Sequence, residues 1–237
     1  MHYKSLDSDK IVATVEALQK RINERFPGFG ISKVCAQLLD ISRLAKDRSL
    51  WIGKPILSLR IGIGFFLLVI VAGAGSTVLS LQMPVQRLDF PQFIQILEAG
   101  INDVVFIGVA IFFFVTLETR IKRRRALKAI HELRSLAHII DMHQLTKDPD
   151  RVISQDGGTA SSPQRKMSPF ELGRYLDYCS EMLSLVGKIA ALYVQHFDDS
   201  VVLSSVNEVE GLTTGLSRKI WQKIMILHSL TQRDMNE

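Results

Sequence analysis

Residues 131–143 hold the side chains best suited to chemistry, three histidines and one aspartate. His131 and His138 are seven positions apart and Asp141 follows three positions later, so a helix would place all three on one face. Imidazole and carboxylate groups bind metals, but a complete site would need further ligands from another helix. Alternatively, these histidines respond to pH, because imidazole titrates near neutral pH. The simplest interpretation is a solvated polar face, so we expect neither a bound metal nor a cofactor.

The chain has none of the spacings that accompany common catalytic sites. The His–Glu pair at His131 does not begin a zinc-protease motif, because the position four residues later is Ser135. The glycines of residues 62–75 lie inside an apolar segment, whereas a nucleotide-binding glycine loop follows a strand. No P-loop, nucleophile elbow or paired-carboxylate pattern is present in the sequence. We therefore expect no catalytic residue and no enzymatic activity.

Two long apolar segments dominate the sequence. The first, residues 61–81, has 21 residues and no charged side chain. An α-helix of that length spans about 30 Å, the thickness of the hydrocarbon core of a bilayer. The second, residues 101–117, is shorter, and together the two raise the mean hydropathy of the chain to +0.16. We predict that they form a transmembrane helical hairpin.

Basic residues flank both apolar segments on their outer sides and are nearly absent between them, where residues 82–100 contain only Arg87. The positive-inside rule then predicts a multi-pass protein with both termini cytoplasmic, most simply in a bacterial inner membrane. The basic residues after the second segment are predicted to contact anionic lipid headgroups. They are Arg120, Lys122, Arg123, Arg124, Arg125 and Lys128. This run has no interleaved aromatic residues, so we attribute it and the net charge of +5 to lipid and not to nucleic acid.

Small and polar side chains in the predicted spans have two candidate roles. Ala72, Ser76 and Ser80 are four positions apart and share one helix face, which suits close packing of helices in lipid. Asn102 and Asp103 lie at the outer mouth of the second span. In an oligomer Asp103 would form an acidic ring that favours cations at a pore mouth. The alternative is a hydrated carboxylate at interface depth, or a helix N-cap.

Apolar periodicity predicts helices on both sides of the hairpin. Residues 7–47 give two helices split at Pro27–Gly30, with Asp9 and Ser32 as expected N-caps. The second span is expected to continue as one long helix through residues 116–145, which contain neither Pro nor Gly. This stalk helix would leave the bilayer and enter the cytosol.

The C-terminal third follows a predicted flexible linker, residues 147–167, and begins with a capping box at Ser168 with proline next to it. The following helix carries a heptad seam of apolar residues from Leu172 to Phe197. Residues 198–200 are expected to end this helix and to cap the last one.

That last helix is predicted over residues 201–230, antiparallel to the helix before it. In it, Gly211 and Gly215 are four positions apart and would let a neighbouring helix approach closely.

The predicted fold class is all-α, a two-helix transmembrane hairpin with a cytosolic helical bundle. The predicted segments are 1–50 (N-terminal helices), 51–119 (hairpin), 120–146 (stalk), 147–167 (linker) and 168–237 (C-terminal helical hairpin).

Two functions fit this layout. The first is a membrane-anchored interaction or scaffold module whose bundle self-associates into a homo-oligomer or docks a soluble cytosolic protein. The second is an oligomeric channel or pore gated by the bundle. The order of elements over roughly the first 145 residues resembles the two-transmembrane effector modules of bacterial defence systems, often called SLATT domains, and this resemblance implies a pore. It rests on no matched motif, so it assigns no residue role.

Overall fold

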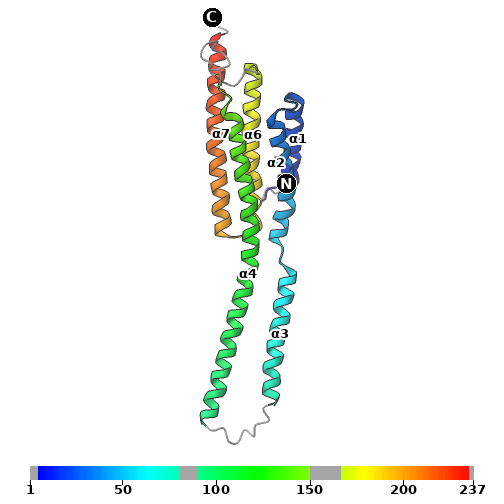
Figure 1. The fold of residues 1–237 in the computed structure, drawn as a ribbon, viewed down its shortest axis with the longest axis vertical. Coiled ribbons are helices and arrows are strands. Elements are labelled where there is room, and N and C mark those ends of the chain that lie inside the picture. Colours follow the sequence, from blue (N-terminus) through cyan, green and yellow to red (C-terminus); the bar gives the residue numbers. More distant parts are fainter. Residues whose placement is uncertain (1–4, 81–89, 150–166, 235–237) are drawn as a thin grey trace. The chain divides into compact units, whose positions relative to one another are not determined.

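The computed structural model describes residues 5–80, 90–149 and 167–234 (Figure 1). All regular elements in these ranges are α-helices, which confirms the all-α fold class. The chain divides into two compact units. We call the residues up to Gly53 and from Arg125 onward the bundle unit, and Lys54–Arg124 the apolar unit. The predicted linker lies almost entirely outside the described residues, which omit 150–166.

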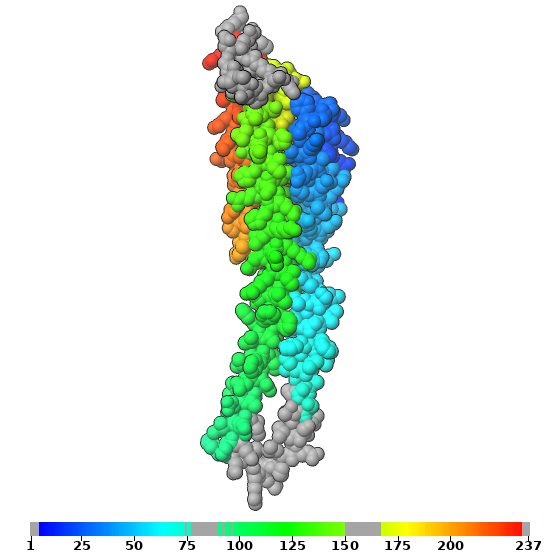
Figure 2. All heavy atoms as spheres, in the orientation of Figure 1, coloured from blue at the N-terminus to red at the C-terminus, as the bar shows by residue number. Residues whose placement is uncertain are grey.

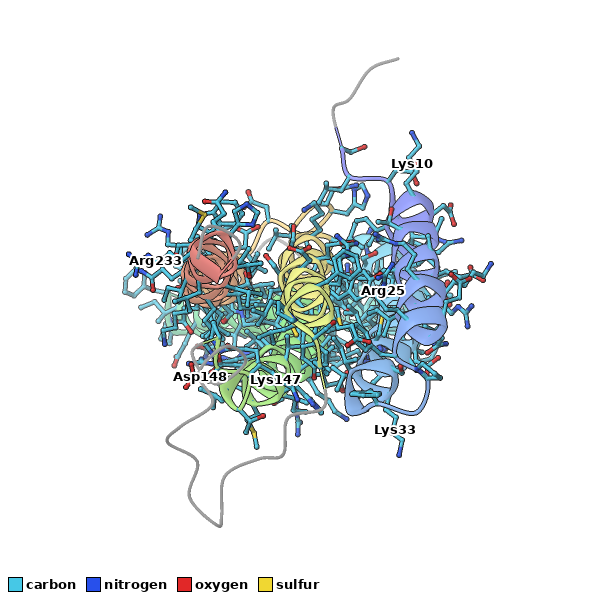
Figure 3. All side chains as sticks on the ribbon, turned by 90° about the horizontal axis from the view of Figure 1, so that it is seen from above. Lys10, Arg25, Lys33, Lys147, Asp148 and Arg233 are labelled. Carbon is cyan, nitrogen blue, oxygen red and sulfur yellow. The ribbon has the colours of Figure 1, made fainter. Side chains whose placement is uncertain are left out.

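The bundle unit is a helical bundle built around α6 (Pro169–Ala191). Figure 3 shows α6 between α7 (Ser200–Asp234) and α1 (Ser8–Arg25). The unit is completed by α2 (Gly30–Gly53) and by the last part of α4 (Phe90–Leu145). Twelve of the 23 residues of α6 are buried, as expected of a helix with neighbours on several sides.

The N-terminal helices follow the predicted split at Pro27–Gly30, where Gly28 takes a positive φ of 77°. The N-cap of α1 is Asp7, whose carboxylate accepts the amides of Asp9 and Lys10, so the prediction of Asp9 was wrong. The carboxylate of Asp9 instead pairs with Lys46 of α2.

The second predicted cap was also wrong. The Ser32 hydroxyl donates to the carbonyl of Phe26 (2.8 Å) and accepts no amide proton from its own helix. Phe26 packs edge-on against Tyr175 and Tyr178 of α6, with ring centroids 5.5 and 6.2 Å apart. The turn between α1 and α2 is therefore anchored on the central helix.

The capping box of α6 is present as predicted, with Ser168 and Glu171 bonded to each other's backbone amides. However, α6 ends at Ala191, so the predicted seam leaves the helix before Phe197. Asp199 caps α7 by accepting the amides of Val201 and Val202, both at 3.1 Å, which confirms the predicted capping region. The last helix continues to Asp234, a few residues beyond the predicted end.

One glycine of α6 that lies against α7 is Gly187. A methyl group there would lie 3.4 Å from the Thr213 hydroxyl oxygen of α7. Gly211 and Gly215, which were predicted to face a neighbouring helix, have no described atom within 4 Å of the position a Cβ would take. Within the described chain, both therefore face open space.

The long helix predicted after the second apolar segment is present, because α4 runs without interruption to Leu145. It also begins earlier than the predicted span, at Phe90. Its last part buries one face in the bundle unit. The buried apolar residues are Ala126, Ala129, Ile130, Leu133, Leu136, Ala137 and Ile140.

The apolar unit contains α3 (Leu57–Ser80) and the first part of α4. The ring of Phe66 contacts that of Phe114 with centroids 5.7 Å apart, and Arg60 reaches Glu118. Since the lower-numbered residue of α3 meets the higher-numbered residue of α4, the two helices run antiparallel.

Candidate functional site: exposed apolar windows and a basic pocket

Two helical stretches are long and apolar enough to cross a membrane. An 18-residue window within Gly30–Gly73 has a mean hydropathy of 2.4, and one within Phe93–Leu145 has 2.1. Neither window is buried inside the structure; Phe65, Phe106 and Phe112, for example, are 69%, 73% and 74% exposed. Each such side chain gains about 1.5–3 kcal/mol on leaving water. The exposed windows therefore strongly favour transfer of this part of the chain from water into an apolar environment.

A charged cluster lies beside these windows, within the apolar unit. The carboxylate of Glu118 accepts the backbone amide of Ile56 at 3.3 Å, Nε of Arg60 at 3.4 Å and Nζ of Lys122 at 2.9 Å. The side chains of Glu118 and Lys122 are only 14% and 11% exposed. Lys122 was grouped with the lipid-contacting cations, but its ammonium is held by a carboxylate one helical turn away.

A pocket of about 440 Å³ lies in the bundle unit between the end of α2 and α4. We call it the Trp51 pocket. Its lining residues are Asp47, Arg48, Trp51 and Ile52 of α2 with Arg125, Lys128 and Ala129 of α4. Figure 2 shows the face of the bundle unit on which α4, in green, lies between α7 and α2.

The arginines of the Trp51 pocket make different interactions. The guanidinium of Arg125 lies over the indole of Trp51, 4.1 Å from the ring centroid, which is a cation–π contact. Arg48 is paired with Glu132 at 2.9 Å. Beside Arg48 lies Tyr193, whose pKa is raised to about 12 because its ring is buried.

The pairing of Arg48 with Glu132 leaves Arg125 and Lys128 as the available cations. Neither has a carboxylate within ion-pair distance among the described residues. An anion could therefore approach both without displacing an existing ion pair.

The other predicted lipid contacts, Arg120, Arg123 and Arg124, belong to the apolar unit. Arg120 and Arg124 are exposed, while Arg123 is half-buried and interacts with the protein. The exposed pair is compatible with a general electrostatic attraction to anionic lipid.

The histidines of α4 are not brought together with other ligands. His131 and His138 are exposed, and the carboxylate of Asp141 accepts a hydrogen bond from the Gln144 amide at 2.6 Å. No group of three or more His, Cys, Asp or Glu side chains within residues 5–80, 90–149 and 167–234 is placed to hold a metal ion. His143 packs against Gly30 of α2, and burial lowers its pKa, with a further contribution from the charge of Lys147.

The candidate packing and pore residues lie on exposed surface. Ala72 and Ser76 are exposed, and the Ser76 hydroxyl donates to the carbonyl of Gly73 in its own helix. The side chain of Ser80 lies outside the described part of the structure. Asn102 and Asp103 are exposed on α4.

Sequence reasoning found the basic residues of the pocket but missed Trp51, which gives the site its aromatic wall. A signal was available, because Trp51 lies ten residues before the first apolar segment. Tryptophan near the end of a span is typical of the membrane–water interface. That it meets Arg125, 74 positions later, could not be deduced from spacing.

Comparison with known proteins adds no further assignment, since no protein-family model, curated protein or solved structure matches the chain.

Proposed function

We propose that this protein is a membrane-anchored interaction module, held in the bilayer by α3 and the first part of α4, with both termini on the cytoplasmic side. The observation that carries the proposal is that two membrane-length apolar windows are not buried in the structure, in a chain whose bundle unit has its own core. In water such windows would drive aggregation, whereas in lipid they anchor the chain. The cations, which flank the windows mainly on their outer sides with Arg87 alone between them, support the orientation.

The bundle unit is the interacting part in this proposal. On α7, Leu203, Trp221 and Met225 are 46%, 62% and 52% exposed. Leu203 and Trp221 are eighteen positions apart, which is five helical turns, and Met225 follows one turn later, so the three share a face. Asn207, Glu210 and Thr214 separate Leu203 from the other two on this face. The exposed apolar pair of Trp221 and Met225 fits self-association of the bundle or docking of a soluble protein.

The anchor and its orientation are tested by cysteine labelling of the full chain. Cys35 and Cys179 are first replaced by alanine, and single cysteines are then introduced as Ser5→Cys, Arg233→Cys and Phe90→Cys. In intact spheroplasts a membrane-impermeant maleimide should label only the Phe90→Cys variant, whereas all three should react after permeabilisation. Labelling of the Ser5 or Arg233 position in intact cells would refute the orientation, and release of the chain by alkaline carbonate would refute the anchor.

A pore is the second candidate, because Asn102 and Asp103 place exposed polar groups on an otherwise apolar part of α4. Reconstituted liposomes separate the two functions. Ion flux that falls in the Asp103→Ala variant would favour the pore over a simple anchor. If the protein is only a membrane anchor, no ion flux is expected at any oligomeric state. The oligomeric state is measured by size-exclusion chromatography with light scattering in neutral detergent.

A further inference from the structure

We propose that the Trp51 pocket binds the phosphate of an anionic phospholipid and holds its glycerol region against the indole. The pocket combines a pair of available cations with an apolar wall. A phospholipid has a matching pair of features, because its anionic phosphate is joined to a less polar glycerol region. Its volume of about 440 Å³ lies within the range of small-molecule sites. This inference rests on the proposed membrane anchor, because the lipid must reach the pocket.

The cationic side of the site comes mainly from α4. Arg125 and Lys128 are three positions apart, so both side chains reach the same side of the helix. The cation–π contact with Trp51 positions the Arg125 guanidinium while leaving its N–H groups able to donate to phosphate oxygens. Lys128 supplies a second donor as a point charge.

The apolar side of the site is the indole of Trp51 with Ile52 and Ala129 behind it. Ile52 and Ala129 are 1% and 2% exposed and belong to the core, whereas Trp51 is 36% exposed. The indole, partly covered by the Arg125 guanidinium, therefore still presents apolar surface that is open to a ligand. Free phosphate would use none of this surface.

Charge also favours a lipid phosphodiester over a free phosphate. Asp47 lines the pocket, and its carboxylate repels a second negative charge. A phosphodiester carries one negative charge, while inorganic phosphate near neutral pH is a mixture of the monoanion and the dianion, so part of it brings a second charge. Asp47 can in addition accept a hydrogen bond from a hydroxyl of a glycerol headgroup.

The position of the pocket in the chain agrees with a lipid ligand. Trp51 precedes the first predicted span by ten residues, and Arg125 follows the second by eight. In the proposed orientation both belong to the segments that leave the cytoplasmic face. Anionic lipids attract juxtamembrane cations there, and tryptophan favours the same depth.

The test uses fluorescence of Trp51 in the full chain, with Trp221→Phe to remove the second of the two tryptophans. The protein is reconstituted into phosphatidylcholine nanodiscs that contain equal mole fractions of either brominated phosphatidylglycerol or brominated phosphatidylcholine. We expect stronger quenching by the brominated phosphatidylglycerol. Arg125→Ala and Lys128→Ala should each raise the mole fraction needed for half-maximal quenching about fivefold, and the double variant should abolish the lipid preference.

The matched control is Arg120→Ala with Arg124→Ala, which removes the same charge from exposed positions outside the pocket. This control should keep the preference for phosphatidylglycerol. If both double variants lose that preference equally, the pocket is not a specific site and the attraction to anionic lipid is diffuse. A change in Trp51 emission in detergent with inorganic phosphate alone, at concentrations similar to those of the lipid, would overturn the lipid as ligand. Failure of the chain to float with vesicles would overturn the anchor itself, whereas flotation without any lipid preference would overturn only the pocket.

Discussion

Replacing Gly211 and Gly215 by alanine should stabilise the protein, because these glycines lie in the interior of α7 and a side chain at either position would meet open space in the described structure. A Cβ at either position meets no described atom within 4 Å, so nothing opposes the gain. In a helix interior alanine is favoured over glycine by about 1 kcal/mol. The double variant should therefore gain about 2 kcal/mol, which corresponds to a rise in Tm of roughly 4–8 °C for a protein of this size.

The measurement is thermal unfolding in neutral detergent, followed by circular dichroism at 222 nm. Gly53→Ala is the control, since it makes the same chemical change at the end of α2, where a methyl group would lie 2.9 Å from the Cβ of His196. A contact this short forces a neighbouring group to shift, so this variant should lose stability. A fall in Tm for Gly211→Ala or Gly215→Ala would refute the reasoning and would mean that another chain packs on these glycines.

Two further predictions concern buried titratable groups. Burial raises the pKa of both Cys35 and Cys179 to about 12, so Ellman's reagent at pH 8 should react with neither thiol until the protein unfolds; rapid reaction of either would contradict this burial. Since both folded-state pKa values lie above the ordinary 9.0, their contribution to stability is complete below pH 9 and should be lost as the pH rises toward 12. His143 behaves oppositely, because burial lowers its pKa below 6.5: its contribution is present above that pH and should be lost as the pH falls, and urea unfolding of His143→Gln should show a weaker decline below pH 6.5 than the unsubstituted chain.

Features specified by neighbouring residues could be predicted from the sequence. The Ser168 capping box and the Asp199 cap each depend on side chains within three positions of the amides they bind. The continuity of α4 over residues 116–145 follows from the absence of Pro and Gly in that stretch. The prediction of the α1 N-cap failed because Asp7 and Asp9 are both suitable residue types. Asp7 caps the helix, while Asp9 pairs with Lys46, which lies 37 positions away in the chain.

The end of α6 could not be predicted, because apolar spacing continues past the point where the helix stops. After Ala191 the chain turns, and Gln195 exchanges hydrogen bonds with the backbone of Leu6 at 2.9 and 3.2 Å. His196 packs so closely on Gly53 that a methyl group at Gly53 would lie 2.9 Å from its Cβ. These contacts join residues more than 140 positions apart, so no local pattern could reveal them.

The basic run after the second apolar segment shows why a charge count is a poor guide to a binding site. Successive residues of a helix point about 100° apart, so six cations in nine positions cannot share one surface. Lys122 lies one turn from Glu118 and is held by it, whereas Arg125 reaches Trp51. Arg120 and Arg124 remain exposed on the same helix. Removing the charges of Arg125 and Lys128 should therefore abolish the lipid preference, whereas removing those of Arg120 and Arg124 should leave it. This difference distinguishes a lipid site from a merely basic membrane flank.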